Sequence, residues 1–393
     1  MTNRDHAYRL LQCLTVASRP LRVEELAEIL ALDFGGAKEG IPKLREEWRW
    51  KDQQEAVLSM CSSLIAVVDN GPHRVVQFSH FSVKEFLTSD RWSTSSADVS
   101  HFRILLEPAH TVIVKACLGI LLRSDSGVGD AKAKSNSPLA EYAATHWTDH
   151  ARFGKVSTSV EDGMRRLFDF ARPHFAAWLK LHDVDTTWYN FVGHRYNSNI
   201  PSGSPLYYAS LCGFRDLTAH LLDEHPDHLH ARVGQNRSPL AAALKEKHFD
   251  IAELLYRRGA DVSIRHDNNR TLLHAASVEG SVDIAQWLLA HGADPNSQED
   301  NRETPLHLAV KNGRVEFVRM LLRHGISVNT EDKDDRTSLH LASESVHREI
   351  VRLLLQHQAD VAARDREHRT PLHLALSWVS VKLHDSCYST GLT

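Results

Sequence analysis

The chain has 393 residues, of which 42% are hydrophobic and 24% charged, and its formal net charge is −4. This length fits two or three domains, and the composition excludes a wholly disordered chain. Without a basic excess, the chain lacks the charge typical of proteins that bind nucleic acids or anionic membranes.

Five widely spaced cysteines without a CxxC pair are typical of reduced thiols in the cytosol or nucleus. We therefore expect a cytoplasmic protein, with the nucleus as the alternative. The longest apolar stretch, 109–122, is shorter than the roughly 20 residues of a membrane-spanning helix. We expect no membrane segment.

The N-terminal part has the pattern of three helices, a β-hairpin and a final short helix. The periodicity of the apolar residues and the turn residues predict elements at 5–17, 23–32, 53–63, 64–68, 74–78 and 81–87. This order is that of a winged helix-turn-helix, which we assign to residues 1–95.

A winged helix raises the alternative of a DNA-binding regulator. The third helix is the one that enters the major groove, yet here it carries Glu55 and no lysine or arginine. Residues 1–100 contain 12 Lys plus Arg against 14 Asp plus Glu, a net charge of −2. We therefore favour a structural or regulatory winged helix over a nucleic-acid reader.

Residues 96–195 have the pattern of a helical spacer. We predict helices over 102–122 with an interruption at Pro108, over 139–147, and over 163–181 with Pro173 inside. The polar, small-residue stretch 123–137 is predicted to be a flexible linker.

The C-terminal half repeats one four-residue phrase. It reads SPLY, SPLA, TLLH, TPLH, TSLH and TPLH, starting at residues 204, 238, 271, 304, 337 and 370. Recurrence of TPLH at a period of about 33 residues is typical of the ankyrin repeat, a β-turn followed by two helices. We therefore predict a mainly α fold, in which winged helix and helical spacer precede an ankyrin-repeat α-solenoid over 196–376, with about five repeats plus a truncated last one.

Each residue of the phrase has a predicted task at the start of the first helix. Thr304 caps the helix, Pro305 occupies its first turn, and His307 reaches back to the threonine. Glycines such as Gly280 and Gly313 are expected to end the first helices in the left-handed conformation.

The last two repeats depart from this pattern. Val346 and Gln358 stand at two glycine positions, where a left-handed backbone costs about 1–2 kcal/mol unless the helix end is remodelled. We expect an apolar edge near Leu353 and Leu372 to be partly exposed. Residues 377–393 are predicted to be an irregular tail that frays from about Trp378.

Two stretches carry a resemblance to a known family. WRWKDQQEAVLSMCSSLIAVV at 48–68 and VVQFSHFSVKEFL at 75–87 resemble the winged-helix domain named after GPI inositol-deacylase. That domain is found in fungal NACHT-ankyrin proteins, which are NLR-like signalling ATPases of the STAND class, and the spacer phrase at 138–152 is similar to theirs. The resemblance of the winged helix extends over residues 1–95.

The resemblance implies a signalling role and a nucleotide-sensing position at His80, next to an ATPase domain. No GxxxxGK[ST] motif occurs in the chain, so His80 is either vestigial or serves a NACHT-type ATPase acting in trans. The deacylase catalytic domain is also missing from the sequence, so the resemblance implies no lipase activity.

No catalytic motif or convincing metal cluster is visible in the sequence. GxSxG and HExxH are absent, and the histidine groups at 225, 228 and 230 and at 146 and 150 lack further ligands. We expect a non-enzymatic protein without a cofactor or metal.

Binding of a protein partner is the function that we predict. In an ankyrin stack, the hairpin tips and the ends of the first helices line the concave face, which here comprises Asp267, Asn268, Arg270, Val278, Glu279, Asp300, Asn301, Glu303, Lys311, Asn312, Lys333, Asp334, Arg336, Glu344 and Ser345. A solvated face without a dedicated partner is the alternative. We expect charge reversal at Arg270, Lys311 and Arg336 to abolish partner capture with little change in stability.

Overall fold

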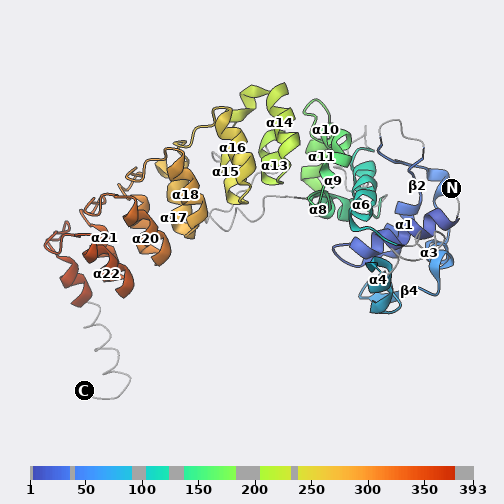
Figure 1. The fold of residues 1–393 in the computed structure, drawn as a ribbon, viewed down its shortest axis with the longest axis horizontal. Helices are drawn as coiled ribbons and strands as arrows, with labels where there is room; N and C mark the ends of the chain where they lie inside the picture. The colour runs from blue at the N-terminus through green and yellow to red at the C-terminus, as the bar shows by residue number, and fades with distance from the viewer. Residues whose placement is uncertain are drawn as a thin grey trace, which may run out of the picture. The chain divides into compact units, whose positions relative to one another are not determined.

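A computed structural model describes residues 3–35, 40–90, 103–123, 137–182, 204–231 and 238–376. The chain divides into two compact units, Met1–Glu224 and His225–Thr393, and Figure 1 labels their helices and strands. The mainly helical fold that we predicted is confirmed. Three predictions fall mostly or wholly outside the described residues. They are the flexible linker at 123–137, the domain boundary at 195–196, and the irregular tail at 377–393 with its fraying.

The N-terminal unit begins with the predicted winged helix. Its elements are α1 (Asn3–Val16), β1 (Leu21–Arg22), α2 (Val23–Leu30), β2 (Leu32–Asp33), β3 (Lys43–Leu44), η1 (Glu46–Trp48), α3 (Gln53–Cys61), β4 (Ile65–Asn70), β5 (His73–Phe78) and α4 (Phe81–Thr88). β4 and β5 form the predicted antiparallel hairpin, and β1 pairs with β5 to complete a three-stranded sheet. The short strands β1, β2 and β3 were not predicted, because two residues are too few to show a strand period.

The spacer is helical as predicted, but the helix bounds differ: the first helix is shorter than 102–122, the second extends beyond 139–147, and the third stretch is divided. Its helices are α6 (Leu106–Leu121), α8 (Ala140–Ala151), α9 (Val156–Ser159), α10 (Glu161–Leu167) and α11 (His174–Leu181). The predicted interruption at Pro108 is wrong, since this proline lies in the first turn of α6, where no N–H is needed. The predicted helix 163–181 is two helices, and Pro173 is the N-cap of the second.

The spacer and the winged helix share one core. α6 packs against α1, and the hydroxyl of Tyr8 donates to the carbonyl of Arg103 at 2.9 Å. Gly119 lies so close to Pro42 that a Cβ atom would stand 2.6 Å from the proline carbonyl oxygen. The winged helix is therefore built into a larger body.

The first helix pair of the repeat region also belongs to this unit. α13 (Pro205–Leu211) and α14 (Arg215–Glu224) join the spacer through an aromatic cluster. The ring of Trp147 stacks on Phe214 at 5.3 Å, and the ring of Phe175 meets Tyr208 at 5.6 Å. The spacer thus covers the first repeat in the way that a capping element covers the end of a solenoid.

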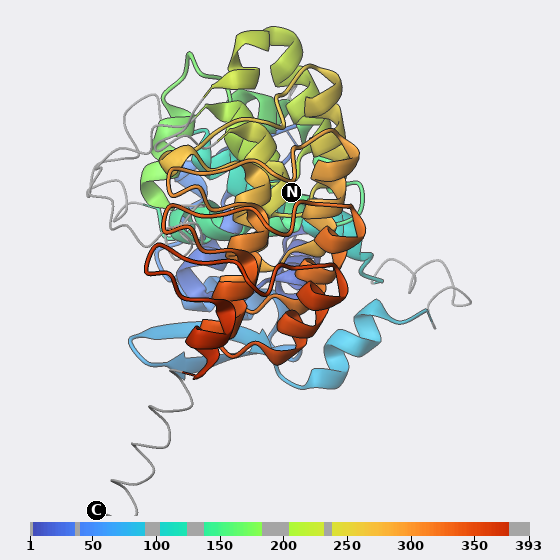
Figure 2. The same cartoon turned by 90° about the vertical axis from the view of Figure 1, so that its left-hand side faces the viewer.

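The C-terminal unit stacks further helix pairs. Its elements are η3 (Pro226–His230), α15 (Pro239–Lys245), α16 (Phe249–Arg257), η4 (Asp267–Asn269), α17 (Leu272–Glu279), α18 (Val282–Ala290), α19 (Pro305–Lys311), α20 (Val315–Arg323), α21 (Ser338–Glu344) and α22 (Arg348–Gln356), followed by a helical turn at 371–376. Leu288, Leu321 and Leu354 occupy the same position in successive second helices, and all three are fully buried. Figure 2 looks along this stack and shows the hairpins one above another beside the helices.

The helix ends in the repeat that begins at Thr337 are strained as predicted. Gly280 and Gly313 have φ of 80° and 64°, and Val346 and Gln358 adopt the same left-handed conformation with φ of 57° and 64°. The helix end is therefore not remodelled to suit these side chains.

The predicted apolar edge is only half correct. Leu372 is 65% exposed, as expected, but Leu353 is buried because α22 packs against α20 and α21.

We predict that Val346→Gly raises the free energy of unfolding by about 1 kcal/mol, because glycine adopts φ of 57° without steric cost. Urea denaturation followed by circular dichroism measures the change. Gly313→Val, at the equivalent position one repeat earlier, is the matched control and should be destabilising, since its Cβ also meets the His347 ring at 3.0 Å. A loss of stability in Val346→Gly contradicts the strain.

Candidate functional site

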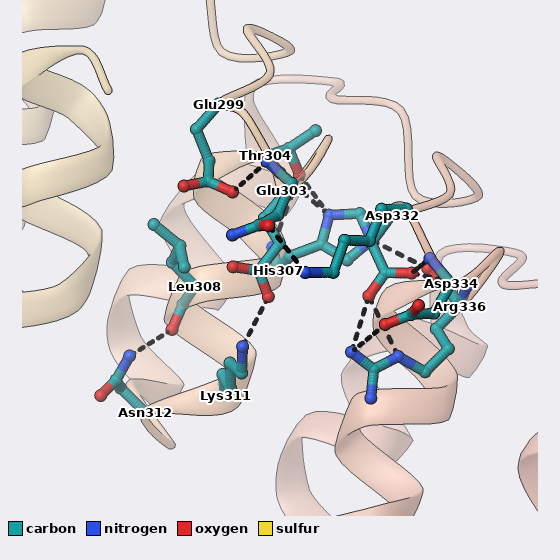
Figure 3. Close-up of polar contacts among 12 residues, drawn as sticks. Glu299, Glu303, Thr304, His307, Leu308, Lys311, Asn312, Asp332, Asp334 and Arg336 are labelled. Atoms are coloured by element: carbon teal, nitrogen blue, oxygen red, sulfur yellow. Dashed lines mark hydrogen bonds and ion pairs between the residues drawn. The ribbon is translucent and has the colours of Figure 1, made fainter. Parts of the chain in front are cut away.

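The start of each first helix is fixed by a threonine and a histidine. The N–H of Thr304 donates to Nδ1 of His307 at 3.1 Å, and the N–H of His307 donates to the threonine hydroxyl at 3.4 Å. Figure 3 shows this pair, and the same arrangement recurs at Thr271 and Thr337. The predicted reach of the histidine back to the threonine is confirmed.

The same histidines also join consecutive repeats, which the sequence did not reveal. Nε2 of His274, His307 and His340 lies 3.1, 3.3 and 3.1 Å from the carbonyls of Glu303, Arg336 and Arg369 in the next hairpin. Because Nδ1 accepts from the threonine N–H, Nε2 carries the proton and donates it. Burial lowers the pKa of His274 to about 4 and also lowers the pKa of His307, so the rings of His274 and His307 are neutral near pH 7.

Successive hairpins are bonded to one another through their backbones. The N–H of Asp300 donates to the carbonyl of Asn268 at 3.0 Å, and the N–H of Lys333 donates to Asn301 at 2.9 Å. The N–H of Arg366 repeats this contact with Asp334 at 2.9 Å. The hairpins therefore form a continuous row with one tip per repeat.

A buried carboxylate supports each of the last three hairpins. Glu299, Asp332 and Asp365 occupy the same position in successive repeats, and their side chains are almost completely buried. Each accepts the N–H of the residue two positions later, at 2.8 to 3.0 Å. The carboxylate thus fixes the turn and needs a cation to offset its charge.

The cation for Asp332 is Arg336 of the same hairpin. Nη2 of Arg336 lies 3.0 Å from the Asp332 carboxylate and 3.5 Å from Asp334, and Nη1 lies 3.6 Å from Glu344. Figure 3 shows this arginine among the acidic side chains. The neighbouring carboxylates, led by Asp332, raise the pKa of Arg336 against the opposing effect of its burial.

The hairpin of Glu299 has Glu303 where the next hairpin has its arginine. Glu299 is instead paired with Arg270 from the preceding hairpin, at 3.2 Å. Glu303 is itself buried, and Nζ of Lys311 donates to it at 2.7 Å. Two buried acids are therefore matched by two half-exposed cations.

Three predicted contact residues thus have a structural task. Arg270, Lys311 and Arg336 each hold a buried carboxylate, so we now predict that their charge reversal lowers stability, in contrast to the sequence-based expectation of little change. Reversal would leave two negative charges together in a poorly solvated place.

The other predicted contact residues differ in exposure. Exposed side chains belong to Asn268, Glu279, Asp300, Asn312, Lys333, Glu344 and Ser345. Val278, Asn301 and Asp334 are half-buried, and the side chain of Asp267 lies outside the described residues. We name this surface, made of the hairpin tips and the ends of the first helices, the hairpin surface.

The sequence analysis missed two residues of the hairpin surface. Arg302 and Asp335 stand at successive tips, both with φ of 58°, and their side chains form an ion pair at 3.9 Å. Their equivalent places in successive repeats, two residues before each threonine, could have identified them.

Helix α3 of the winged helix presents no basic side chain. It carries Glu55, and its Ala56 and Val57 are buried.

His80 is the N-cap of α4, where its Nδ1 accepts the N–H of Ser82 at 3.2 Å. The ring thus has a local structural task, and its predicted contact with a nucleotide stays a prediction.

His150 lies in a polar cluster inside the N-terminal unit. Its Nδ1 is 2.9 Å from Nδ1 of His110, and its Nε2 is 2.8 Å from the hydroxyl of Tyr142. Burial lowers the pKa of His150 to about 3.

Across the described ranges, no group of three His, Cys, Asp or Glu residues is arranged to hold a metal, and no helix combines the length and apolar character of a bilayer span.

Comparison with known proteins agrees with this geometry. Residues 206–299, 272–365 and 327–384 match the ankyrin repeats family. The chain carries an ankyrin-repeat array. Residues 1–101 match the winged helix domain of GPI inositol-deacylase, so both predicted domain types are confirmed.

Two relatives match the chain to different extents. "Azaphilone pigments biosynthesis cluster protein L" of Monascus ruber is 31% identical over 274 residues, which are 66% of this chain and 56% of that protein. "Alpha-latrocrustotoxin-Lt1a" of Latrodectus tredecimguttatus is 32% identical over 71 residues, or 18% of this chain and 5% of the toxin. The matched residues thus span little more than half of the first relative.

Proposed function

We propose that this chain is a non-enzymatic interaction protein whose ankyrin array binds a protein partner on its concave face, along the hairpin surface. The ankyrin match supports an interaction role. The observation that carries the proposal is the rigid construction of this surface, since hairpin-to-hairpin hydrogen bonds and buried ion pairs hold each tip in place. A surface ordered before binding loses less conformational entropy when the partner arrives.

The partner contacts come from the exposed members of the hairpin surface. Glu279, Asp300 and Ser345 have exposed side chains. Unlike Arg270, Lys311 and Arg336, they are not the residues that hold the buried carboxylates in place. Arg270, Lys311 and Arg336 keep the tips in shape and add their half-exposed charges to the rim of the contact.

The winged helix and the spacer couple this array to NLR-like signalling through a NACHT-type ATPase acting in trans. This part of the proposal rests on the resemblance of residues 48–68 and 75–87 to the winged helices of fungal NACHT-ankyrin proteins; the family comparison itself gives the domain type, a winged helix over residues 1–101. Co-purification of an ATPase with the full chain, and its loss when residues 1–101 are exchanged for an unrelated domain, tests it.

The contact surface is tested with Glu279→Arg, Asp300→Arg and Ser345→Arg combined in the full chain. We expect at least a tenfold loss of partner recovered by affinity purification and mass spectrometry, with a change below about 0.5 kcal/mol in the free energy of unfolding. Gln286→Arg and Glu316→Arg, which add arginines on the second helices, are the control and should keep the partner. Equal recovery with both sets of variants contradicts the assignment.

A further inference from the structure

Helix α4 of the winged helix is poorly buried for so apolar a sequence. Within Phe81–Thr88, Leu87 is the residue that is buried. Phe81 is 71% exposed and Phe86 is 53% exposed. Aromatic side chains in such positions mark a surface that is covered in the working assembly.

An apolar groove runs beside this helix. It has a volume of about 790 Å³ and lies between α1 and α4, with Tyr8, Leu11, Met60, Leu64 and Phe86 among its lining residues. Grooves of this kind take apolar ligands or the apolar face of a helix.

The apolar surface continues past the end of α4. The N–H of Ile104 donates to the carbonyl of Leu87 at 2.9 Å, which places the following Leu105 and Leu106, 50% and 42% exposed, next to that helix. Together with the two phenyl rings they expose roughly 400 Å² of apolar surface per chain, as much as the largest patch on a typical monomer.

The arrangement fits a second copy of the same chain. One surface presents both an apolar groove and, as one of its walls, the short helix α4, with Phe86 in the groove lining and Phe81 exposed on the same helix. A twofold axis lets α4 of each copy enter the groove of the other, so a single isologous interface covers both features. The exposed side chains of both copies, Phe86 of the groove wall included, contribute roughly 800 Å², and the remaining groove walls add area toward the roughly 1,200–2,000 Å² of a specific interface.

The charges at the rim are compatible with this pairing. The groove is lined by Arg4 on α1 and by Glu85 on α4, which are opposite charges on opposite walls. Under a twofold axis, Glu85 of one copy faces Arg4 of the other, so the surface is complementary to itself.

We propose that the chain forms a twofold dimer in which α4 of each copy occupies the groove between α1 and α4 of the other. The dimer presents two ankyrin arrays and binds a multivalent partner with higher avidity than a single chain.

Two measurements on the full chain test the proposal. Light scattering coupled to size exclusion gives the molar mass between about 1 and 100 μM, and reaction with a maleimide gives the reactivity of the Cys61 thiol. Cys61 lines the groove, whereas Cys13, Cys117 and Cys212 are buried, and all variants carry Cys387→Ser. We expect a dimer whose Cys61 reacts with a maleimide at least tenfold more slowly than in Phe81→Ser/Phe86→Ser, which should be monomeric. Val361→Ser, an exposed apolar residue of the C-terminal unit, is the control and should remain dimeric.

A charge exchange provides a second test that does not remove apolar surface. Glu85→Arg should weaken the dimer about tenfold, and Arg4→Glu combined with Glu85→Arg should restore it. A monomer with a protected Cys61 overturns the proposal, because the chain then covers its own groove. A monomer with a reactive Cys61 also overturns it, and so does a dimer that survives the double serine variant.

Discussion

Arg336→Glu is expected to lower the free energy of unfolding by about 4 kcal/mol, because loss of one partner of a buried ion pair leaves the other charge poorly solvated, at a typical cost of about 3–5 kcal/mol. The Asp332 side chain is 1% exposed, and the Arg336 guanidinium 3.0 Å away is the cation that offsets its charge. Here the reversal also adds a second carboxylate beside the first, with Asp334 and Glu344 close by.

Urea denaturation followed by circular dichroism measures this loss. Lys333→Glu is the matched control, since it makes the same charge change at an earlier position of the same hairpin. Lys333 is exposed and donates to the side chain of Asn301 at 2.8 Å, so its reversal should cost less than about 1 kcal/mol. Similar losses for the two variants would show that the burial of Asp332 does not decide the effect.

The stability of the repeats is expected to fall steeply when the pH drops below about 6.5. The pKa of His274 is near 6.5 in the unfolded chain and about 4 in the folded one, where burial disfavours the charged ring. Between these values the unfolded state binds the extra proton, so acidification favours unfolding by about 1.4 kcal/mol per pH unit for this histidine. His307, whose pKa burial also lowers, changes stability in the same direction.

The geometry explains why these rings resist protonation. Nδ1 of His274 accepts the N–H of Thr271 at 3.2 Å, and a proton on this nitrogen would turn the contact into two facing donors. Acid therefore loosens the start of the helix, where the Thr271 N–H loses its acceptor, while Nε2 keeps the proton that it donates to the next hairpin.

The His274 contribution is measured by urea denaturation at pH 7, 6 and 5. His274→Ala copies the residue that the chain itself has at Ala241, the equivalent position of an earlier repeat. We expect the variant to be less stable at pH 7 but to lose about 1.4 kcal/mol less per pH unit on acidification. A variant with the slope of the unmodified chain contradicts a neutral, buried His274.

The sequence by itself determined the repeat architecture, because its features are local. A helix start depends on Thr304, Pro305 and His307, and a helix end depends on a left-handed residue such as Gly280, all within a short stretch of chain. Each such signal recurs from repeat to repeat, so an exception in one copy does not hide the period. The winged helix followed in the same way from its helix periodicity and its hairpin turn.

Tertiary structure alone decided which charges are structural. The sequence does not show that Arg270 meets Glu299, because the two belong to different hairpins and come together only when the repeats stack. Nor does it distinguish Lys333, which is solvated, from Arg336, which holds a buried acid. Burial depends on the packing of distant segments, and it is burial that turns an ordinary surface charge into a support for the hairpin surface.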